Sequence, residues 1–291
     1  MTHDLEPTSK FYDSQGLKLH YLDWGNTEAP LLILIHGMHD HARSWDWVAR
    51  RLCADWHVIA VDLRGHGDSA WSPDGVYHNP YLLHDLVDLV DSLGAETVTL
   101  IAHSLGGNPA TRFAALYPAQ VEKLVLVDAM GPYPSVVAAW DKEGVVNRSR
   151  GWLEKRQLTS SRAPRRFATL EEAIARMARV NPHLSDEQIR HLATHAVRQH
   201  ADGFGWKYDP HTGNFLPEDF AIHLQPYWCE VAAPTLICWG NRSWTSNPAI
   251  DGSAAHFRHH QNLEFDNAGH WIHHDKLEEF VAAVKQFLQA Q

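Results

Sequence analysis

The sequence has few of the residues that mark secreted, membrane-spanning or nucleic-acid-binding proteins. It contains only three cysteines, with no C-x-x-C spacing, which indicates free thiols in a reducing compartment. The formal net charge of −10 argues against nucleic acid as a partner, because binding phosphates requires a basic surface. The N-terminus "MTHDLEPTSK" has no apolar stretch, and no later run is long enough to span a membrane. We therefore expect a cytoplasmic protein with no membrane span.

Histidine is plentiful, with 22 residues, yet no set of them has the spacing of a metal site. Close pairs occur at His39 and His41, at 259–260 and at 273–274, but none is joined by further ligands at a recognisable spacing. The sequence thus predicts neither a metal ion nor another cofactor.

Short apolar runs alternate with helical patterns through the first 130 residues. Two alternating segments around Gln15 and Gly16 predict a hairpin. The runs "PLLILIHG", "WHVIAVD", "TVTLIAHS" and "VEKLVLVDA" predict strands buried on both faces, and residues 80–93 have helical spacing. "APTLICWG", "QNLEFDNAG" and "LEEFVAAVKQFLQ" continue the alternation near the end. The predicted class is α/β, with a mostly parallel eight-stranded sheet and helices on both faces.

The alternation is interrupted after Met130. Residues 132–232 contain helix-like pieces such as "TLEEAIARMARV" and "SDEQIRHLATHAVRQ", the second with a capping signal at its start, and no strand-like run of comparable strength. We expect a core formed by residues 1–131 and 233–291, with 132–232 as a mostly helical insertion.

"IAHSLGG" places Ser104 between a predicted buried strand and a helix. A serine on such a turn projects from the sheet edge, and the following helix N-terminus favours developing negative charge. Ala102 stands where glycine is commonest, which weakens the match to G-x-S-x-G only slightly. Ser104 is the candidate nucleophile; the alternative is an N-cap serine in a glycine-rich turn.

Two further motifs fit a nucleophilic serine. In "LIHGM" the strand ends at His36 and Gly37, so the Met38 N–H can join the Leu105 N–H in an oxyanion hole. In "NAGHWIHHDKLEEF", His270 lies after a strand and before the last helix, and it is the best candidate for the general base. Either motif alone also fits a purely structural role.

With "HGM", "DLRGHGDS" (62–69), "AHSLGG" (102–107) and "AGHWIHHDKLEEF" in this order, the chain resembles the α/β-hydrolase superfamily over nearly its whole length. The resemblance implies the α/β-hydrolase fold and a catalytic triad, with residues 132–232 as a cap over the active site. It also implies that "DLRGHGDS" is a structural turn without catalytic residues.

One residue of the family pattern is missing. Relatives usually place an aspartate three residues beyond the glycine of "LICWG", and here that residue is Ser243. Asp128, at the end of "KLVLVD", lies 24 residues after Ser104, where haloalkane dehalogenases among other relatives carry the acid. We expect Asp128 to orient His270, although it also fits a strand-end cap; Asp251 and Asp266 are poorer candidates. This leaves Ser243 and Trp244 free to shape a pocket wall.

Serine at the elbow argues against the aspartate-dependent chemistry of dehalogenases and epoxide hydrolases. The predicted activity is carboxylesterase-like, hydrolysis of a small-molecule ester or related acyl compound through an acyl-enzyme. Alternatives are a carbon–carbon bond hydrolase of the same fold and a non-catalytic ligand-binding relative. The protein is expected to be a monomer or homodimer.

The inserted segment and its borders are rich in aromatic and basic residues. The aromatic ones fit either an apolar pocket or simple packing of the cap, and the basic ones fit either steering of an anionic substrate or a solvated surface. The basic residues are Arg148, Arg150, Lys155, Arg156, Arg162, Arg165 and Arg166.

Overall fold

The computed structural model describes residues 5–131, 133–215 and 224–290. Eight of the described strands form one sheet, in which β1, β2 and β4 pair antiparallel and every other neighbouring pair is parallel. In spatial order the strands are β1 (Thr8–Ser14), β2 (Leu17–Asp23), β4 (His57–Val61), β3 (Leu31–Ile35), β5 (Val98–His103), β6 (Val121–Val127), β9 (Thr235–Gly240) and β10 (His260–Phe265). The predicted α/β class and the mostly parallel eight-stranded sheet are confirmed.

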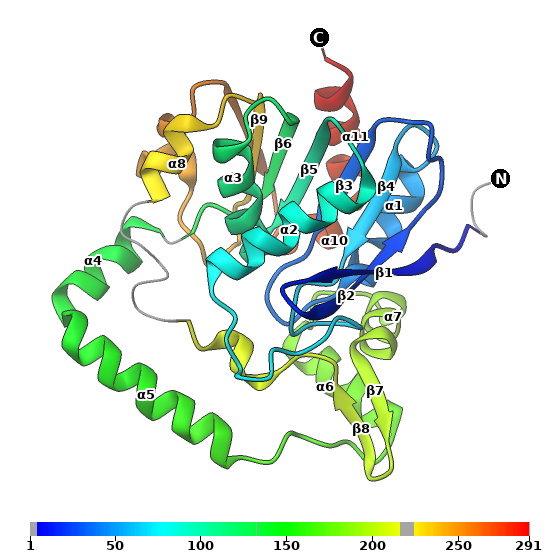
Figure 1. Ribbon diagram of the computed structural model, residues 1–291, viewed down its shortest axis with the longest axis vertical. Helices are drawn as coiled ribbons and strands as arrows, with labels where there is room; N and C mark the ends of the chain where they lie inside the picture. The colour runs from blue at the N-terminus through cyan, green and yellow to red at the C-terminus, as the bar shows by residue number, and fades with distance from the viewer. Residues whose placement is uncertain (1–4, 132, 216–223, 291) are drawn as a thin grey trace.

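Each face of the sheet carries its own hydrophobic core. Successive side chains of a strand point to opposite faces, so Ile33 and Ile35 join one core while Leu32 and Leu34 join the other. The first core is covered by α2 (Asn79–Leu93), α3 (Gly107–Leu116) and α8 (Leu224–Glu230), and the second by α1 (Asp46–Leu52) and α11 (Leu277–Gln289) (Figure 1). Burial on both faces is why the strands appear in the sequence as continuous apolar runs.

The predicted hairpin joins β1 and β2. Its two turn residues, Gln15 and Gly16, both have positive φ, 49° and 78°, as a two-residue turn of type I′ requires. Short helical turns complete the core: η1 (Ala42–Trp45), η2 (Ser104–Gly106), α9 (Pro248–Asp251), η4 (Ala254–His256) and α10 (Ile272–Asp275).

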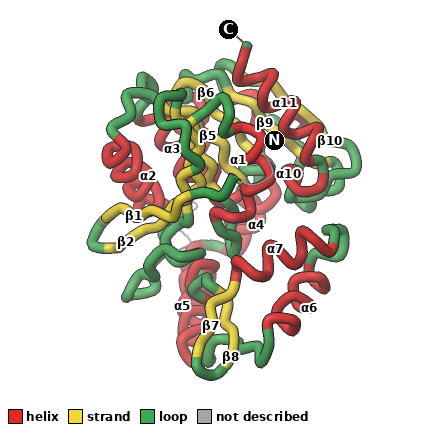
Figure 2. Tube along the Cα trace, turned by 90° about the vertical axis from the view of Figure 1, so that its right-hand side faces the viewer, coloured by secondary structure: helices red, strands yellow, loops and turns green. Residues whose placement is uncertain are grey.

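Between β6 and α8 the described chain forms a second group of elements, which lies to one side of the sheet in both views (Figures 1 and 2). It contains α4 (Pro134–Glu143), α5 (Val145–Ser161), α6 (Leu170–Val180), α7 (Asp186–Ala196), β7 (Val197–His200), β8 (Gly203–Trp206) and η3 (Pro210–Gly213). Helix α7 begins with the expected cap, in which Ser185 and Gln188 form a reciprocal capping box.

The sequence did not predict the β7–β8 hairpin, because "VRQH" and "GFGW" are short and lack apolar alternation. Treating residues 132–232 as a separate cap domain stays a prediction. Among the described residues, no helix has the length and apolar character needed to cross a membrane.

Candidate active site

Ser104 lies directly after β5, at the start of η2, and its backbone is in the left-handed region with φ 50°. This conformation is unfavourable for a residue with a side chain and concentrates at functional sites. The turn connects the buried strand β5 to α3. A serine motif of this kind indicates a catalytic nucleophile when it lies between a strand and a helix, as it does here.

Two glycines after Ser104 allow the turn to pack closely against its neighbours. A Cβ on Gly106 would lie 2.7 Å from Ile35 Cγ2 and 2.8 Å from the His36 carbonyl oxygen. A Cβ on Gly107 would lie 2.5 Å from the Ala129 Cβ. The turn is therefore pressed between the ends of β3 and β6, which carry other candidate residues.

His270 bridges Ser104 and Asp128. Its Nε2 lies 2.9 Å from Ser104 Oγ, and its Nδ1 lies 2.9 Å from Asp128 Oδ2. A carboxylate accepts, so Nδ1 carries the proton and Nε2 is free to accept from the serine hydroxyl. The structure thus brings the three predicted residues into one hydrogen-bonded chain.

Asp128 follows β6 in a left-handed conformation, φ 49°, and is buried. Its backbone N–H donates to the Cys238 carbonyl of β9 at 2.8 Å. Two hydroxyl groups after β9 hold its carboxylate: Ser243 Oγ donates to Oδ2 and Thr245 Oγ1 donates to Oδ1, both at 2.5 Å. Thr245 in turn accepts a hydrogen bond from Trp239 Nε1 at 3.0 Å.

The contacts of Asp128 correct the interpretation of the loop after β9. Ser243 is not free to shape a pocket wall, because its hydroxyl is bonded to the carboxylate that contacts His270. Trp244 is 73% exposed, with its ring centroid 5.0 Å from that of His270. No local sequence pattern marks the contacts of Ser243 and Thr245.

The other two acid candidates are used elsewhere. Asp251 accepts hydrogen bonds from Ser253 and Ser246 within its own loop, and Asp266 accepts one from Asn241 at 2.8 Å. Among the contacts of the described residues, neither carboxylate reaches His270.

The backbone around Met38 lies beside Ser104. A Cβ on Gly37 would be 3.1 Å from Ser104 Cβ, so the loop after β3 passes directly over the serine. Leu105 follows Ser104 in η2, which leads into α3. The use of the Met38 and Leu105 N–H groups as oxyanion donors stays a prediction.

His103 is a buried neighbour that the sequence did not single out. Its Nε2 lies 3.0 Å from the His270 carbonyl oxygen, and because a carbonyl only accepts, Nε2 carries the proton. Burial, and then the proximity of His270, hold the pKa of His103 well below its usual range. His103 is thus a neutral donor that fixes the backbone of His270.

The "DLRGHGDS" turn is held by its own polar network. Asp62 accepts from His20 Nδ1 at 2.6 Å and from the backbone N–H of Ala42 at 2.7 Å. Burial alone would raise the pKa of Asp62, but the hydrogen bond from His20 and the electrostatic attraction between the two side chains hold it below its usual range. Arg64 forms a buried two-pronged ion pair with Asp85, with both contacts at 2.6 Å. These contacts are those of a structural turn.

Two groups of described residues have potential metal-ligand atoms within 4.8 Å of one another. One joins Asp40 with His273 and His274; the ring of His273 is stacked against Trp45 with a centroid distance of 4.3 Å. The other joins His20, Asp62 and Asp68, and there the carboxylate of Asp62 already accepts the hydrogen bonds described above. The sequence missed the first group because Asp40 is distant along the chain.

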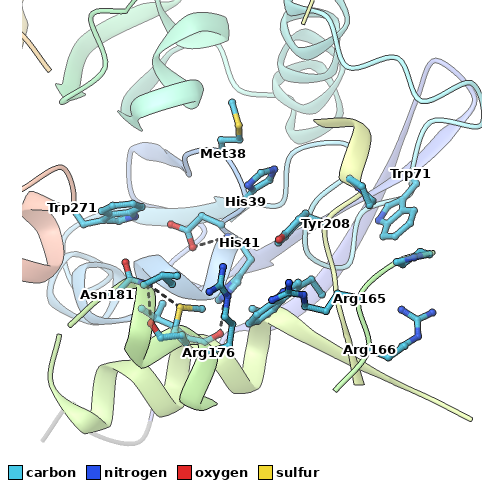
Figure 3. Close-up of a pocket in the computed structure, with 18 of the residues that line it drawn as sticks. Met38, His39, His41, Trp71, Arg165, Arg166, Arg176, Asn181, Tyr208 and Trp271 are labelled. Carbon is cyan, nitrogen blue, oxygen red and sulfur yellow. Dashed lines mark hydrogen bonds between the residues drawn. The ribbon is translucent and has the colours of Figure 1, made fainter. Parts of the chain in front are cut away.

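A cavity of about 730 Å³ lies between the core loops and the inserted segment (Figure 3). On the core side it is lined by Met38, His39 and His41, and by Trp271 next to His270. On the other side it is lined by residues of α6, α7 and β8, and by the chain from Arg162 to Arg166. Ser104, Asp128 and His270 are not among its described lining residues, and the link between the cavity and the candidate triad is Trp271, whose ring centroid lies 5.0 Å from that of His270.

Comparisons with known proteins agree with the fold. The sequence model of the alpha/beta hydrolase fold family matches residues 30–277, and the chain belongs to this family. "Serine hydrolase-like protein" of Danio rerio is 33% identical over 64% of this chain, and the alignment spans only 57% of that protein. "Epoxide hydrolase 3" of Mus musculus is 27% identical over 95% of this chain and 75% of its own length. The solved structure of an esterase from Mycobacterium tuberculosis has a TM-score of 0.79 and 26% identity, covering 98% of this chain and 93% of that one.

Proposed function

We propose that the protein is a serine hydrolase that cleaves carboxylic esters or related acyl compounds, with Ser104 as nucleophile, His270 as general base and acid, and Asp128 as the orienting acid. The observation that carries the proposal is the pair of 2.9 Å hydrogen bonds through which His270 bridges Ser104 and Asp128. Nucleophile, base and orienting acid in this order are the arrangement used for acyl transfer on several unrelated folds.

In the first half of the reaction, Ser104 Oγ attacks the acyl carbon while His270 Nε2 takes the serine proton. The acyl oxygen becomes negatively charged in this step and would accept hydrogen bonds from the Met38 and Leu105 N–H groups. His270 then gives its proton to the departing alcohol, which leaves Ser104 acylated. In the second half, His270 deprotonates a water molecule, which attacks the acyl carbon, and returns that proton to Ser104 as the acid leaves.

The role proposed for Asp128 is to stabilise the imidazolium at both stages. Its carboxylate fixes the tautomer of His270 and faces the positive charge that forms on the ring. The hydroxyl groups of Ser243 and Thr245 hold the carboxylate in place without adding charge.

The relatives support a hydrolase activity in general. Cleavage of esters in particular is our proposal. The similarity to an epoxide hydrolase does not carry its substrate to this chain, because the elbow residue is a serine rather than the aspartate that epoxide opening uses. The similarity to an esterase fits the serine.

Hydrolysis of short-chain 4-nitrophenyl esters, together with labelling by a fluorophosphonate, tests the proposal. We expect the wild-type protein to do both and Ser104→Ala to do neither. Ser92→Ala is the matched control and should retain both, because the Ser92 hydroxyl donates to the Leu89 carbonyl within α2, away from the candidate triad. Turnover of a diketone but of no ester would assign carbon–carbon cleavage instead, and absence of both turnover and labelling would indicate a binding protein.

A further inference from the structure

The cavity beside the candidate triad is positively charged, although the whole chain carries a formal charge of −10. Four arginines are among the described residues that line it, whereas Asp40 is the single carboxylate among them. The arginines come from two parts of the insertion: the chain before α6 supplies Arg162, Arg165 and Arg166, and α6 itself supplies Arg176.

Most of this charge lacks a compensating carboxylate. Arg166 pairs with Asp202 at 3.2 Å. Within the described part of the chain, Arg165 and Arg176 have no carboxylate within the 4.0 Å of an ion pair. Arg176 is also half-buried in the cavity wall, so its charge is less well hydrated than that of a fully exposed side chain.

Asp40 does not neutralise the arginines fully. It lies on the core side of the cavity, and burial raises its pKa to about 7, so that near neutral pH it is protonated for a large part of the time. His39, on the same side, adds no charge, because burial and then the nearby Lys155 lower its pKa to about 4. The field inside the cavity is therefore set by the arginines.

The rest of the lining is suited to an apolar body. Tyr208 stacks on His39 with a centroid distance of 4.1 Å and on Trp206 at 6.3 Å. Met177 and Leu192 add aliphatic surface. In Figure 3, Arg165 and Arg176 lie on the side of the cavity opposite Met38 and His39, while Arg166 lies toward its outer edge with Trp71.

We propose that Arg165 and Arg176 bind an anionic group, a carboxylate or a phosphate, at the far end of an acyl substrate whose apolar body lies along Tyr208 and Trp206. This inference rests on the proposed serine hydrolase, because the lining also includes Trp271, whose ring lies 5.0 Å from that of His270, and Met38, which follows the Gly37 that packs against Ser104. The guanidinium group suits both anions, since it can donate two parallel hydrogen bonds to either.

The test compares two series of substrates. One is the mono-4-nitrophenyl esters of dicarboxylic acids of increasing chain length, and the other is the same compounds with the free carboxylate capped as a methyl ester. We expect kcat/KM to favour the anionic member by about tenfold or more at the chain length that reaches the arginines. Added salt should reduce this preference, because Arg165 is exposed and Arg176 is only half-buried.

The double variant Arg165→Gln/Arg176→Gln should lower the ratio of anionic to neutral kcat/KM toward one. Arg179→Gln is the matched control: it changes an exposed arginine one turn further along α6 that is not part of the cavity lining, and the ratio should stay at the wild-type value. A ratio near one in the wild type, or an equal ratio in the double variant, would overturn the anion site.

Binding measured without turnover separates this inference from the proposed function. Calorimetry with glutarate and with inorganic phosphate, on wild type and on both arginine variants, reports the anion site directly and distinguishes a carboxylate from a phosphate. If neither ester series is hydrolysed, the serine hydrolase fails; binding of either anion that the double variant loses would still support the site. Absence of binding by both anions together with no anionic preference would overturn it.

Discussion

Ser243 donates a 2.5 Å hydrogen bond to Asp128 Oδ2, the same carboxylate oxygen that accepts from His270 Nδ1. Ser243 is the residue at which relatives usually carry the aspartate. Here the hydroxyl of Ser243 contacts a carboxylate at the end of β6, the strand paired with β9. The pairing of the two strands brings the serine and the proposed acid together at the same edge of the sheet.

This contact predicts unequal effects for two substitutions. Asp128→Asn should reduce kcat by about 10⁴-fold, because it removes the charge that faces the imidazolium and favours the wrong tautomer of His270. Ser243→Ala should reduce kcat by about tenfold, since Thr245 still holds the other carboxylate oxygen. Rates with a 4-nitrophenyl ester at saturation give both values. Near-normal activity of Asp128→Asn would refute the proposed acid.

A carboxylate on the loop after β9 should be able to take over the proposed role of Asp128. Asp128→Asn/Ser243→Asp should recover activity about tenfold or more over Asp128→Asn, because the new carboxylate would lie close to the position that Oδ2 occupies now. Asp128→Asn/Ser243→Asn is the uncharged control and should recover nothing. Equal rates for the two double variants would show that a carboxylate at residue 243 does not reach His270.

Ser243→Asp alone should destabilise the fold. It places two carboxylates where a hydroxyl and a carboxylate are now 2.5 Å apart, and like charges at this distance cannot both ionise without a large penalty. One of them must take up a proton, so we expect the loss in Tm relative to wild type to be larger at pH 8 than at pH 5. An equal loss at both pH values would contradict the electrostatic cause.

The close packing of the serine turn makes a prediction about stability. Gly107→Ala should lower the free energy of unfolding by about 1–3 kcal/mol, because the new Cβ would lie 2.5 Å from that of Ala129. Gly151→Ala is the matched control in α5, where a Cβ meets nothing within 4 Å, and it should raise stability by about 0.5–1 kcal/mol. Urea unfolding measures both. A loss of the same size in the two variants would point to a general effect of removing glycine.

The features that could be predicted are those that depend on short stretches of sequence. Burial on both faces makes the strands visible as apolar runs, and the serine turn has its own motif. Asp128 could be proposed because the end of a parallel strand always meets the same sheet edge as Ser104. These inferences need only the strand order and direction.

Features that depend on side chains meeting across long sequence distances were not predictable. Ser243 and Thr245 lie more than 100 residues from the carboxylate they hold, and nothing around them marks that contact. The basic residues of the insertion left two roles open, because the sequence does not say which of them face the cavity. The structure places Arg162, Arg165 and Arg166 there and adds Arg176, which the sequence had not singled out.

Stability should fall as the pH is lowered from about 6.5 to 4. Burial lowers the pKa of His41 to about 4 and that of His274 to about 3, so in this range the unfolded chain, with a histidine pKa of about 6.5, binds more protons than the folded one. Asp40 acts in the opposite direction, because its raised pKa, about 7, makes the folded state hold an extra proton down to about pH 4. The buried histidines outnumber Asp40, since four more of them also have lowered pKa values: His36, His66, His103 and His273.

Calorimetry should therefore show Tm decreasing with acidification. His274→Gln should reduce the dependence of the unfolding free energy on pH by about one proton. A Tm that rises on acidification would contradict neutral burial of these histidines.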